Sequence, residues 1–273
     1  MKTTTVNGIE LAYRIDGEKS KPWIILSNSL ATDYRMWDPQ IPTLTLSHCV
    51  LRYDTRGHGQ SQASAGDYSL ELLISDAVGL MNELGIAKAD VMGLSLGGMT
   101  ALGLAIHHAD RVDRLICCDA RADAPLPYVN FWQERISIAR QKGLAAIVSG
   151  TLERWFTEEF RAEPQKSTSL ALATDMMLST SVDGFCGCAA ALTRLNLTPL
   201  LGSISSPTLC LAGDQDQAAP PNTMRDIANA IRLGSFTVLT DAAHLSNLNQ
   251  PTAFNRAIGS WLADGNSQTD CVS

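Results

Sequence analysis

Residues 89–98 read Ala89-Asp90-Val91-Met92-Gly93-Leu94-Ser95-Leu96-Gly97-Gly98 and carry the strongest structural signal in the chain. Residues 89–92 favour a short buried strand, residues 99–107 favour a helix, and Gly-x-Ser-x-Gly stands between them. Strand, sharp turn and helix are what a nucleophile elbow requires, and its glycines are needed because a Cβ there would collide with neighbouring backbone. The turn lifts the Ser95 hydroxyl above the sheet, at the positive end of the following helix. We therefore expect Ser95 to be a nucleophile; the alternative is a tight turn without chemistry.

Strands and helices alternate outward from this turn. The amino-terminal residues predict a hairpin in which Asn7-Gly8 joins strands at 3–6 and 9–15. Further strands are expected at residues 23–27, 48–53, 112–118, 207–212 and 235–239, and further helices at 69–84, 223–231 and 251–262. Ser69 is expected to cap the first of these helices. The alternation predicts an α/β fold with a mostly parallel, doubly wound sheet.

Residues 121–195 break this alternation, because they show helical patterns and no convincing strand. Helices are expected at 128–142, 144–156, 167–178 and 182–195. A helical insertion between two strands of a parallel sheet predicts a lid over the carboxyl ends of the strands, where ligands bind in open α/β sheets. We therefore expect a core of residues 1–120 and 196–273 and a helical lid of residues 121–195.

A serine nucleophile needs a general base, because a free hydroxyl is a poor nucleophile at neutral pH. Of the five histidines, His107 and His108 fall at the far end of the helix that follows Ser95. His244 lies in the loop after the last strand, at the same edge of the sheet as the elbow. We therefore predict that His244 is the base.

The carboxylate that orients the base should lie between serine and histidine in the chain. Asp216 is preferred, because Gly213 starts a turn and Asp216 lies far enough along to curl back toward the histidine loop. Asp214 is expected to face solvent or cap the turn, and Asp119, which ends the strand at 112–118, is a weaker rival.

An oxyanion hole needs two backbone N–H groups that point at the developing negative charge. Leu96, directly after the nucleophile, is expected to supply one. The loop after the strand at 23–27 is expected to supply the other from Leu30, with Ser29 as the alternative. An ordinary loop remains a further alternative at this position.

The composition suits a folded domain. Hydrophobic residues make up 45% of the 273 residues and charged residues 18%, which excludes disorder and a coiled coil. The 21 Lys and Arg and the 28 Asp and Glu give a net charge of −7, with no basic cluster. We therefore expect no nucleic-acid partner.

Other patterns bear on the compartment and on cofactors. The amino terminus has no apolar stretch of the signal-peptide kind, and the longest nearly uncharged stretch, residues 93–106, is shorter than the roughly 20 residues that span a bilayer. Seven cysteines, most of them in apolar runs, predict buried free thiols, so we expect a soluble cytoplasmic protein without a membrane partner. Cys186-x-Cys188 lacks the further ligands of a metal site, and the glycines form no dinucleotide fingerprint, so neither a metal nor a cofactor is expected.

Four segments together resemble the α/β-hydrolase superfamily, namely residues 54–61, 93–98, 213–216 and 241–244. Within it, Leu26-Ser27-Asn28-Ser29-Leu30, followed by Arg35-Met36-Trp37-Asp38, resembles the 3-oxoadipate enol-lactonases. So do Arg154-Trp155-Phe156-Thr157 and Gly184-Phe185-Cys186-Gly187-Cys188-Ala189-Ala190. Two features depart from the family: Ala31 stands where such enzymes usually have glycine, and residues 119–123 are more charged than expected.

The resemblance implies an α/β-hydrolase fold with a triad of Ser95, Asp216 and His244. It also implies that Trp132 and Arg135 face the substrate, and we expect Ser29 to contact it as well. The expected activity is cofactor-free hydrolysis of a small ester or lactone, with 3-oxoadipate enol-lactone as the substrate that the resemblance indicates.

Rival activities stay open at this point, as does the oligomeric state. They are an acyl-homoserine lactonase, a carbon–carbon bond hydrolase and, in another class, a non-catalytic ligand receptor on the same fold. Residues 121–195 hold eight Lys and Arg and eight Asp and Glu, so the insertion is neutral overall. Its arginines could still hold a carboxylate locally.

Overall fold

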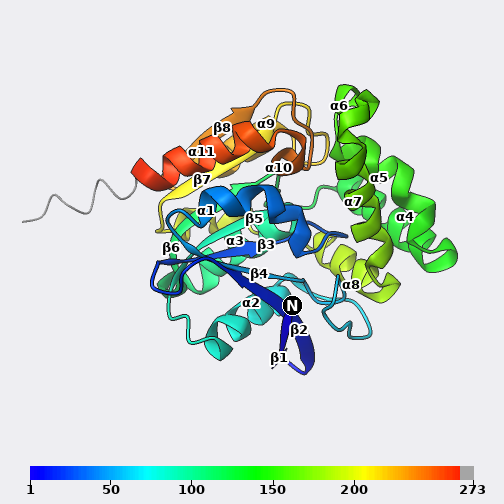
Figure 1. Ribbon diagram of the computed structural model, residues 1–273. Helices are drawn as coiled ribbons and strands as arrows, with labels where there is room; N and C mark the ends of the chain where they lie inside the picture. Colours follow the sequence, from blue (N-terminus) through cyan, green and yellow to red (C-terminus); the bar gives the residue numbers. More distant parts are fainter. Residues whose placement is uncertain (265–273) are drawn as a thin grey trace, which may run out of the picture.

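The computed structural model describes residues 1–264 and is built around an eight-stranded sheet (Figure 1). The strand order is β1-β2-β4-β3-β5-β6-β7-β8. The strands are β1 (Lys2–Val6), β2 (Ile9–Asp16), β3 (Trp23–Ser27), β4 (Cys49–Tyr53), β5 (Ala89–Leu94), β6 (Val112–Cys118), β7 (Thr208–Gly213) and β8 (Gly234–Leu239). β2 pairs antiparallel with β1 and β4, and every other neighbouring pair is parallel. The expected hairpin and the mostly parallel sheet are therefore confirmed.

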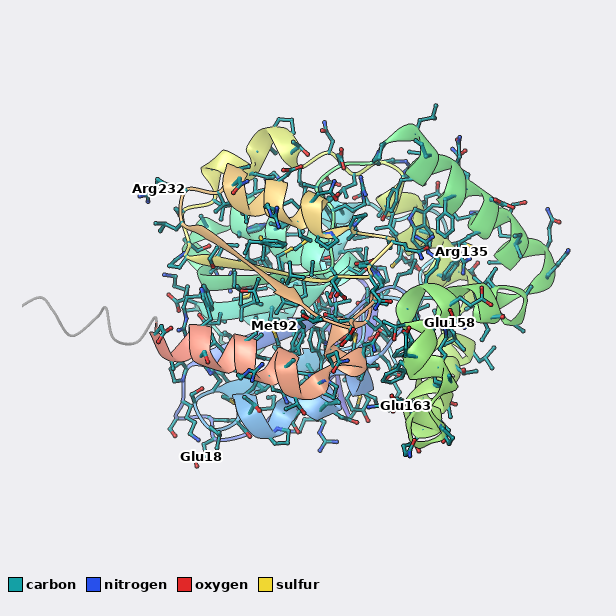
Figure 2. The ribbon with its side chains drawn as sticks, turned by 90° about the horizontal axis from the view of Figure 1, so that it is seen from above. Glu18, Met92, Arg135, Glu158, Glu163 and Arg232 are labelled. Atoms are coloured by element: carbon teal, nitrogen blue, oxygen red, sulfur yellow. The ribbon has the colours of Figure 1, made fainter. Side chains whose placement is uncertain are left out.

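Helices cover both faces of the sheet, so that its central strands are buried on both sides and read as continuous apolar runs. The helices of this core are η1 (Tyr34–Gln40), α1 (Ile41–Leu44), α2 (Leu70–Glu83), α3 (Leu96–His107), η2 (Ala109–Arg111), η5 (Thr198–Ser203), α9 (Pro221–Ala230), α10 (Ser246–Asn249) and α11 (Pro251–Asp264). α1 and α11 lie on one face, and α2, α3 and α9 on the other (Figure 2). Ser69 caps α2 as expected, because its side chain accepts a hydrogen bond from the amide of Leu72.

The segment between β6 and β7 is helical and lies beside the carboxyl ends of the strands (Figure 1). Its helices are α4 (Leu126–Lys142), η3 (Leu144–Ile147), α5 (Val148–Trp155), α6 (Glu158–Ala162), η4 (Pro164–Lys166), α7 (Ser167–Ser179) and α8 (Val182–Leu192). An isolated bridge between Asp123 and Asn196 joins the two ends of the insertion. We call residues 121–195 the helical insertion; that it opens and closes as a lid stays a prediction.

The insertion is held against the core by close backbone contact. A Cβ added to Gly184 on α8 would lie 2.3 Å from the carbonyl oxygen of Gly57, so the two backbones touch. The hydroxyl of Ser181 donates to the same carbonyl at 3.0 Å. The ring of Tyr68 fills the space beside Gly187, where a Cβ would lie 2.7 Å from it. α8 is therefore packed directly on the loops that follow β4.

Two expectations about the whole chain concern its cysteines and its apolar helices. Six of the seven cysteines are buried and free, as expected, and Cys271 lies outside the described residues. Within residues 1–264, no helix combines the length and the apolar character that crossing a membrane requires.

Candidate active site

The turn between β5 and α3 is an elbow with Ser95 at its tip. Ser95 has a φ of 57° and a ψ of −117°, a conformation that L residues rarely adopt. A Cβ on Gly93 would lie 2.0 Å from the carbonyl oxygen of Gly97, and one on Gly97 would lie 2.0 Å from that of Ser27. Backbone thus passes against backbone on both sides of the serine, and both positions require glycine.

Ser95, His244 and Asp216 form one chain of hydrogen bonds. His244 Nε2 lies 2.9 Å from the hydroxyl oxygen of Ser95, and His244 Nδ1 lies 2.8 Å from Oδ2 of Asp216. The other carboxylate oxygen of Asp216 accepts the amides of Ala218 and Ala219 at 2.7 and 3.1 Å. These two bonds fix the carboxylate so that its free oxygen faces the imidazole, although the three side chains come from three separate loops.

The two rival aspartates lie close by but have other partners. Asp119 accepts hydrogen bonds from the amide of Gly213 at 2.9 Å and from the hydroxyl of Ser246. Burial raises the pKa of Asp119 well above its ordinary value, and the charge of Asp216 raises it further. Asp214 is exposed and accepts the amide of Ala242 at 3.1 Å, which agrees with its expected place at the turn. Of the three, Asp216 is the one that reaches His244.

The loop expected to supply an oxyanion donor runs beside Ser95. The amide of Ser29 donates to the sulfur of Met36 at 3.3 Å, so that amide is already engaged. Leu30 follows it at the wall of the cavity, and Ala31 has a φ of 61°. The side chain of Asn28 holds the loop to the core by donating to the carbonyl of Tyr53 at 2.7 Å. Leu96, the other expected donor, is the first residue of α3.

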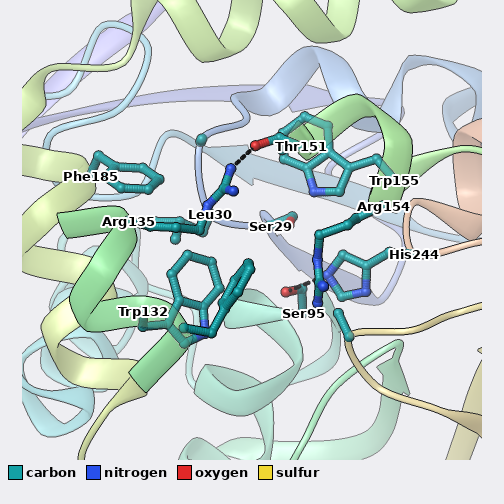
Figure 3. Close-up of a pocket in the computed structure, with 13 residues that line it drawn as sticks. Ser29, Leu30, Ser95, Trp132, Arg135, Thr151, Arg154, Trp155, Phe185 and His244 are labelled. Carbon is teal, nitrogen blue, oxygen red and sulfur yellow. Dashed lines mark hydrogen bonds between the residues drawn. The ribbon is translucent and has the colours of Figure 1, made fainter. Parts of the chain in front are cut away.

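A cavity of about 430 Å³, including its open mouth, lies above Ser95 and His244 and below the helical insertion (Figure 3). Its lining residues are Ser29, Leu30, Ala31, Ser95, Phe131, Trp132, Arg135, Thr151, Arg154, Trp155, Phe185, Ala218 and His244. Three of these, Ser29, Trp132 and Arg135, are the residues that the sequence suggested for substrate contact. Their place in the cavity agrees with that expectation, and their contact with a substrate stays a prediction.

Two arginines of the insertion share one aromatic ring inside this cavity. The guanidinium carbons of Arg135 and Arg154 lie 5.2 and 4.4 Å from the ring centre of Phe131. Arg135 also donates to the carbonyl of Ile147 at 3.1 Å and to the hydroxyl of Thr151. Burial lowers the pKa of Arg135 to about 10, and the charge of Arg154 contributes in the same direction.

Burial also lowers the pKa of Arg154. Among the ion pairs of residues 1–264, none joins a carboxylate to Arg135 or Arg154. Two half-buried cations without an acidic partner make a site that favours an anion. Arg154 and Phe131 were not predicted as site residues from the sequence, although Arg154-Trp155 is among the residues that carry the family resemblance.

Two other histidines, His48 and His58, contact groups outside the chain of Ser95, His244 and Asp216, and His107 is the last residue of α3. His48 pairs with Asp90 at 2.9 Å, and Nδ1 of His58 lies 3.0 Å from the carbonyl of Arg56. Among the residues that the structure describes, no three His, Cys, Asp or Glu side chains gather to hold a metal ion.

The chain is similar along nearly its whole length to known proteins of one fold family. A 3-oxoadipate enol-lactonase of Acinetobacter baylyi is 36% identical over 259 residues, which cover 94% of each chain. The crystal structure of the enol-lactonase from Burkholderia xenovorans LB400 superposes with a TM-score of 0.92 at 40% identity, over 96% of this chain and all of that one. A thermophilic esterase from Thermogutta terrifontis, with malate bound, has a TM-score of 0.88 at 32% identity over 96% of both chains. The alpha/beta hydrolase fold family matches residues 22–251, which make up most of this chain. The chain therefore belongs to that family.

Proposed function

We propose that this protein is a serine hydrolase that opens 3-oxoadipate enol-lactone. The family and the enol-lactonase relatives support the coarser statement, a hydrolase of carboxylic esters or lactones. The observation that carries the proposal is the hydrogen-bonded chain Ser95–His244–Asp216 at the floor of a cavity that holds two unpaired arginines.

In the first half of the reaction, His244 Nε2 takes the proton of the Ser95 hydroxyl while its oxygen attacks the lactone carbonyl. Asp216 stabilises the imidazolium that forms, through Nδ1. The amides of Leu96 and Leu30 donate to the tetrahedral oxyanion; Leu30 is preferred over Ser29 because the Ser29 amide already donates to Met36.

Collapse of this intermediate breaks the ring C–O bond, and the imidazolium of His244 returns its proton to the enol oxygen that leaves. The former ring oxygen is now an enol hydroxyl, joined to the acyl group on Ser95 only through the carbon chain of the opened ring. A water molecule then gives a proton to His244 and attacks the ester carbonyl. Ser95 leaves with that proton, and the open-chain acid is released.

The two arginines explain the choice of substrate. Adipate is a dicarboxylic acid, so a lactone made from one carboxyl group leaves the other free and charged. Arg135 and Arg154 line the cavity and form no ion pair with a carboxylate within residues 1–264, and a substrate carboxylate fits this site. An acyl-homoserine lactone carries no such charge, and the arginines therefore do not favour it.

The test uses a fluorophosphonate probe and three substrates. We expect the wild type to be labelled at Ser95 and to hydrolyse 3-oxoadipate enol-lactone faster than an acyl-homoserine lactone or an aryl acetate. Ser95→Ala is expected to lose labelling and turnover, a fall of about 10⁴-fold or more, with little change in melting temperature. A folded wild type that reacts with neither probe nor ester would point to a ligand receptor instead. Retained turnover in Ser95→Ala would show that the nucleophile is a different residue.

A further inference from the structure

Asp119 is a buried carboxylate at the carboxyl end of β6 that the proposed reaction does not use. Its side chain is fully buried, and its φ of 46° is unusual for a residue other than glycine. One carboxylate oxygen accepts the amide of Gly213 at 2.9 Å, and the other accepts the hydroxyl of Ser246. A strained, buried acid with a separate donor on each oxygen is costly to keep, so its partners indicate its role.

Both partners belong to segments that carry members of the hydrogen-bonded chain. Gly213 starts the turn that bears Asp216, and Ser246 is the first residue of α10, just after His244. The residue before Asp119 completes the set, because the carbonyl of Cys118 accepts the amide of Ser95 at 2.9 Å. Residues 118–119 therefore contact the segments that hold the nucleophile, the acid and the base.

The acid turn and the base loop are already joined to each other without Asp119. The amide of Gln215 donates to the carbonyl of Ala242 at 2.9 Å, and Asp214 accepts the amide of Ala242. These bonds tie the two loops together, and the pairing of β6 with β7, continued by the amide of Asp119 donating to the carbonyl of Leu211 at 2.8 Å, ties the acid turn to β6. The side chain of Asp119 adds one bond to each loop from the strand against which the elbow rests.

We propose that Asp119 is a positioning residue that fixes Asp216 and His244 relative to Ser95. The proposal rests on the serine-hydrolase function proposed above. Its expected effect is large, because a displacement of about 1 Å between reacting groups lowers a rate by about 100-fold. Asp119 is fully buried and is not among the residues that line the cavity, so its loss should lower kcat and the reactivity of Ser95 while leaving KM nearly unchanged.

The experiment compares two substitutions at this position. Asp119→Ala removes both bonds, and we expect kcat on an aryl acetate and the rate constant of fluorophosphonate labelling to fall together by about 10- to 100-fold, with KM within about threefold. Asp119→Asn can keep both bonds, because its oxygen can accept from Gly213 while its NH₂ group donates to the oxygen of Ser246. We expect Asp119→Asn to recover both rates to within about fivefold of the wild type.

Asp90→Asn is the matched control for a buried aspartate that affects stability alone. Asp90 is also buried and bonded, to His48 and Arg114, but near the opposite end of β5 from the elbow. Its variant is expected to lower the melting temperature while keeping the wild-type rate constants.

Three results would overturn the proposal. The first is Asp119→Ala with rates as close to wild type as those of Asp90→Asn. The second is a loss of both rate constants in Asp119→Asn that is as large as the loss in Asp119→Ala. That result would assign the effect to the charge of Asp119 rather than to the position of the loops. If Asp119→Ala does not fold, Ser246→Ala removes one of the two donors and should lower both rates about 3- to 10-fold; unchanged rates are the third. If the folded wild type does not react with the fluorophosphonate probe, the serine-hydrolase function itself is contradicted.

Discussion

Backbone strain gathers at the site. Of the five non-glycine residues with positive φ within residues 1–264, Ser95 and Ala31 line the cavity and Asp119 borders the loops beneath it. Such conformations cost about 1 to 3 kcal/mol each and persist where the surrounding packing determines them. At Ser95 the packing is close, because the backbone on both sides of the turn contacts Gly93 and Gly97 directly. These three strained backbone positions therefore lie at the cavity and in the segments that border it.

Arg154 provides the residue-scale test of the anion site. Arg154→Met removes the charge and keeps a long side chain over Phe131. If the guanidinium binds a substrate carboxylate, KM for the enol-lactone should rise about 10- to 100-fold, because a charged hydrogen bond contributes about 1.5 to 3 kcal/mol. kcat/KM for a neutral aryl acetate should stay within about threefold of the wild type, and steady-state kinetics on both substrates measure the difference.

Arg161→Met, at an exposed position of α6, is the control and should leave both substrates unaffected. Equal losses on the charged and the neutral substrate in Arg154→Met would contradict a carboxylate site and indicate a role in packing.

At the scale of elements, the contact between α8 and the loop after β4 joins the helical insertion to the core. Gly184→Ala would place a Cβ 2.3 Å from the carbonyl oxygen of Gly57, which cannot move freely because Ser181 bonds to the same carbonyl. We expect Gly184→Ala to lower the free energy of unfolding by about 3 kcal/mol, as overpacking against backbone does, and urea denaturation measures it.

Gly150→Ala is the matched control, because Gly150 is an exposed residue of α5 with nothing within 4 Å of an added Cβ. That variant should be stabilised by up to about 1 kcal/mol, since alanine is the better helix former. If Gly184→Ala proved as stable as the wild type, the close packing of α8 on the core would be refuted.

The elements differ in how well the sequence predicted them. The strands agree with their predicted ranges to within one or two residues, because buried parallel strands are short apolar runs bounded by turn residues. The short helices η1, α1 and α6 were not predicted, since a helical period needs more than one or two turns to be visible. The helix expected over 144–156 is divided into η3 and α5.

At the scale of the whole molecule, two buried groups act oppositely on stability as the pH falls. Burial lowers the pKa of His58 from 6.5 to about 4, so its neutral form stabilises the fold above pH 6.5 and this contribution is lost as the pH falls toward 4. Burial raises the pKa of Asp54 from 3.8 to about 6, so its protonation favours the fold as the pH falls through that range. In the wild type these two contributions therefore partly offset each other.

Substituting His58 separates them. The free energy of unfolding of the wild type minus that of His58→Gln should decrease by about 3 kcal/mol between pH 7 and pH 4, because one pKa unit corresponds to about 1.4 kcal/mol. Asp54 contributes equally to both proteins and cancels. Urea denaturation at several pH values measures the difference. A difference that does not change with pH would mean that His58 titrates normally in the folded protein.

The order of the strands and helices, the hairpin and the elbow could be predicted from the sequence because each depends on residues a few positions apart. Gly93 and Gly97 limit the same turn that holds Ser95, and Asn7-Gly8 sits inside its own hairpin. The sequence also preferred Asp216 over its two rivals, but the hydrogen bond between Asp216 and His244 is seen only in the tertiary structure, and so is the meeting of Arg135 and Arg154 on Phe131. Those contacts join loops and helices that are far apart in the chain. They depend on how the elements pack together in three dimensions, which hydrophobic periodicity and turn residues do not specify.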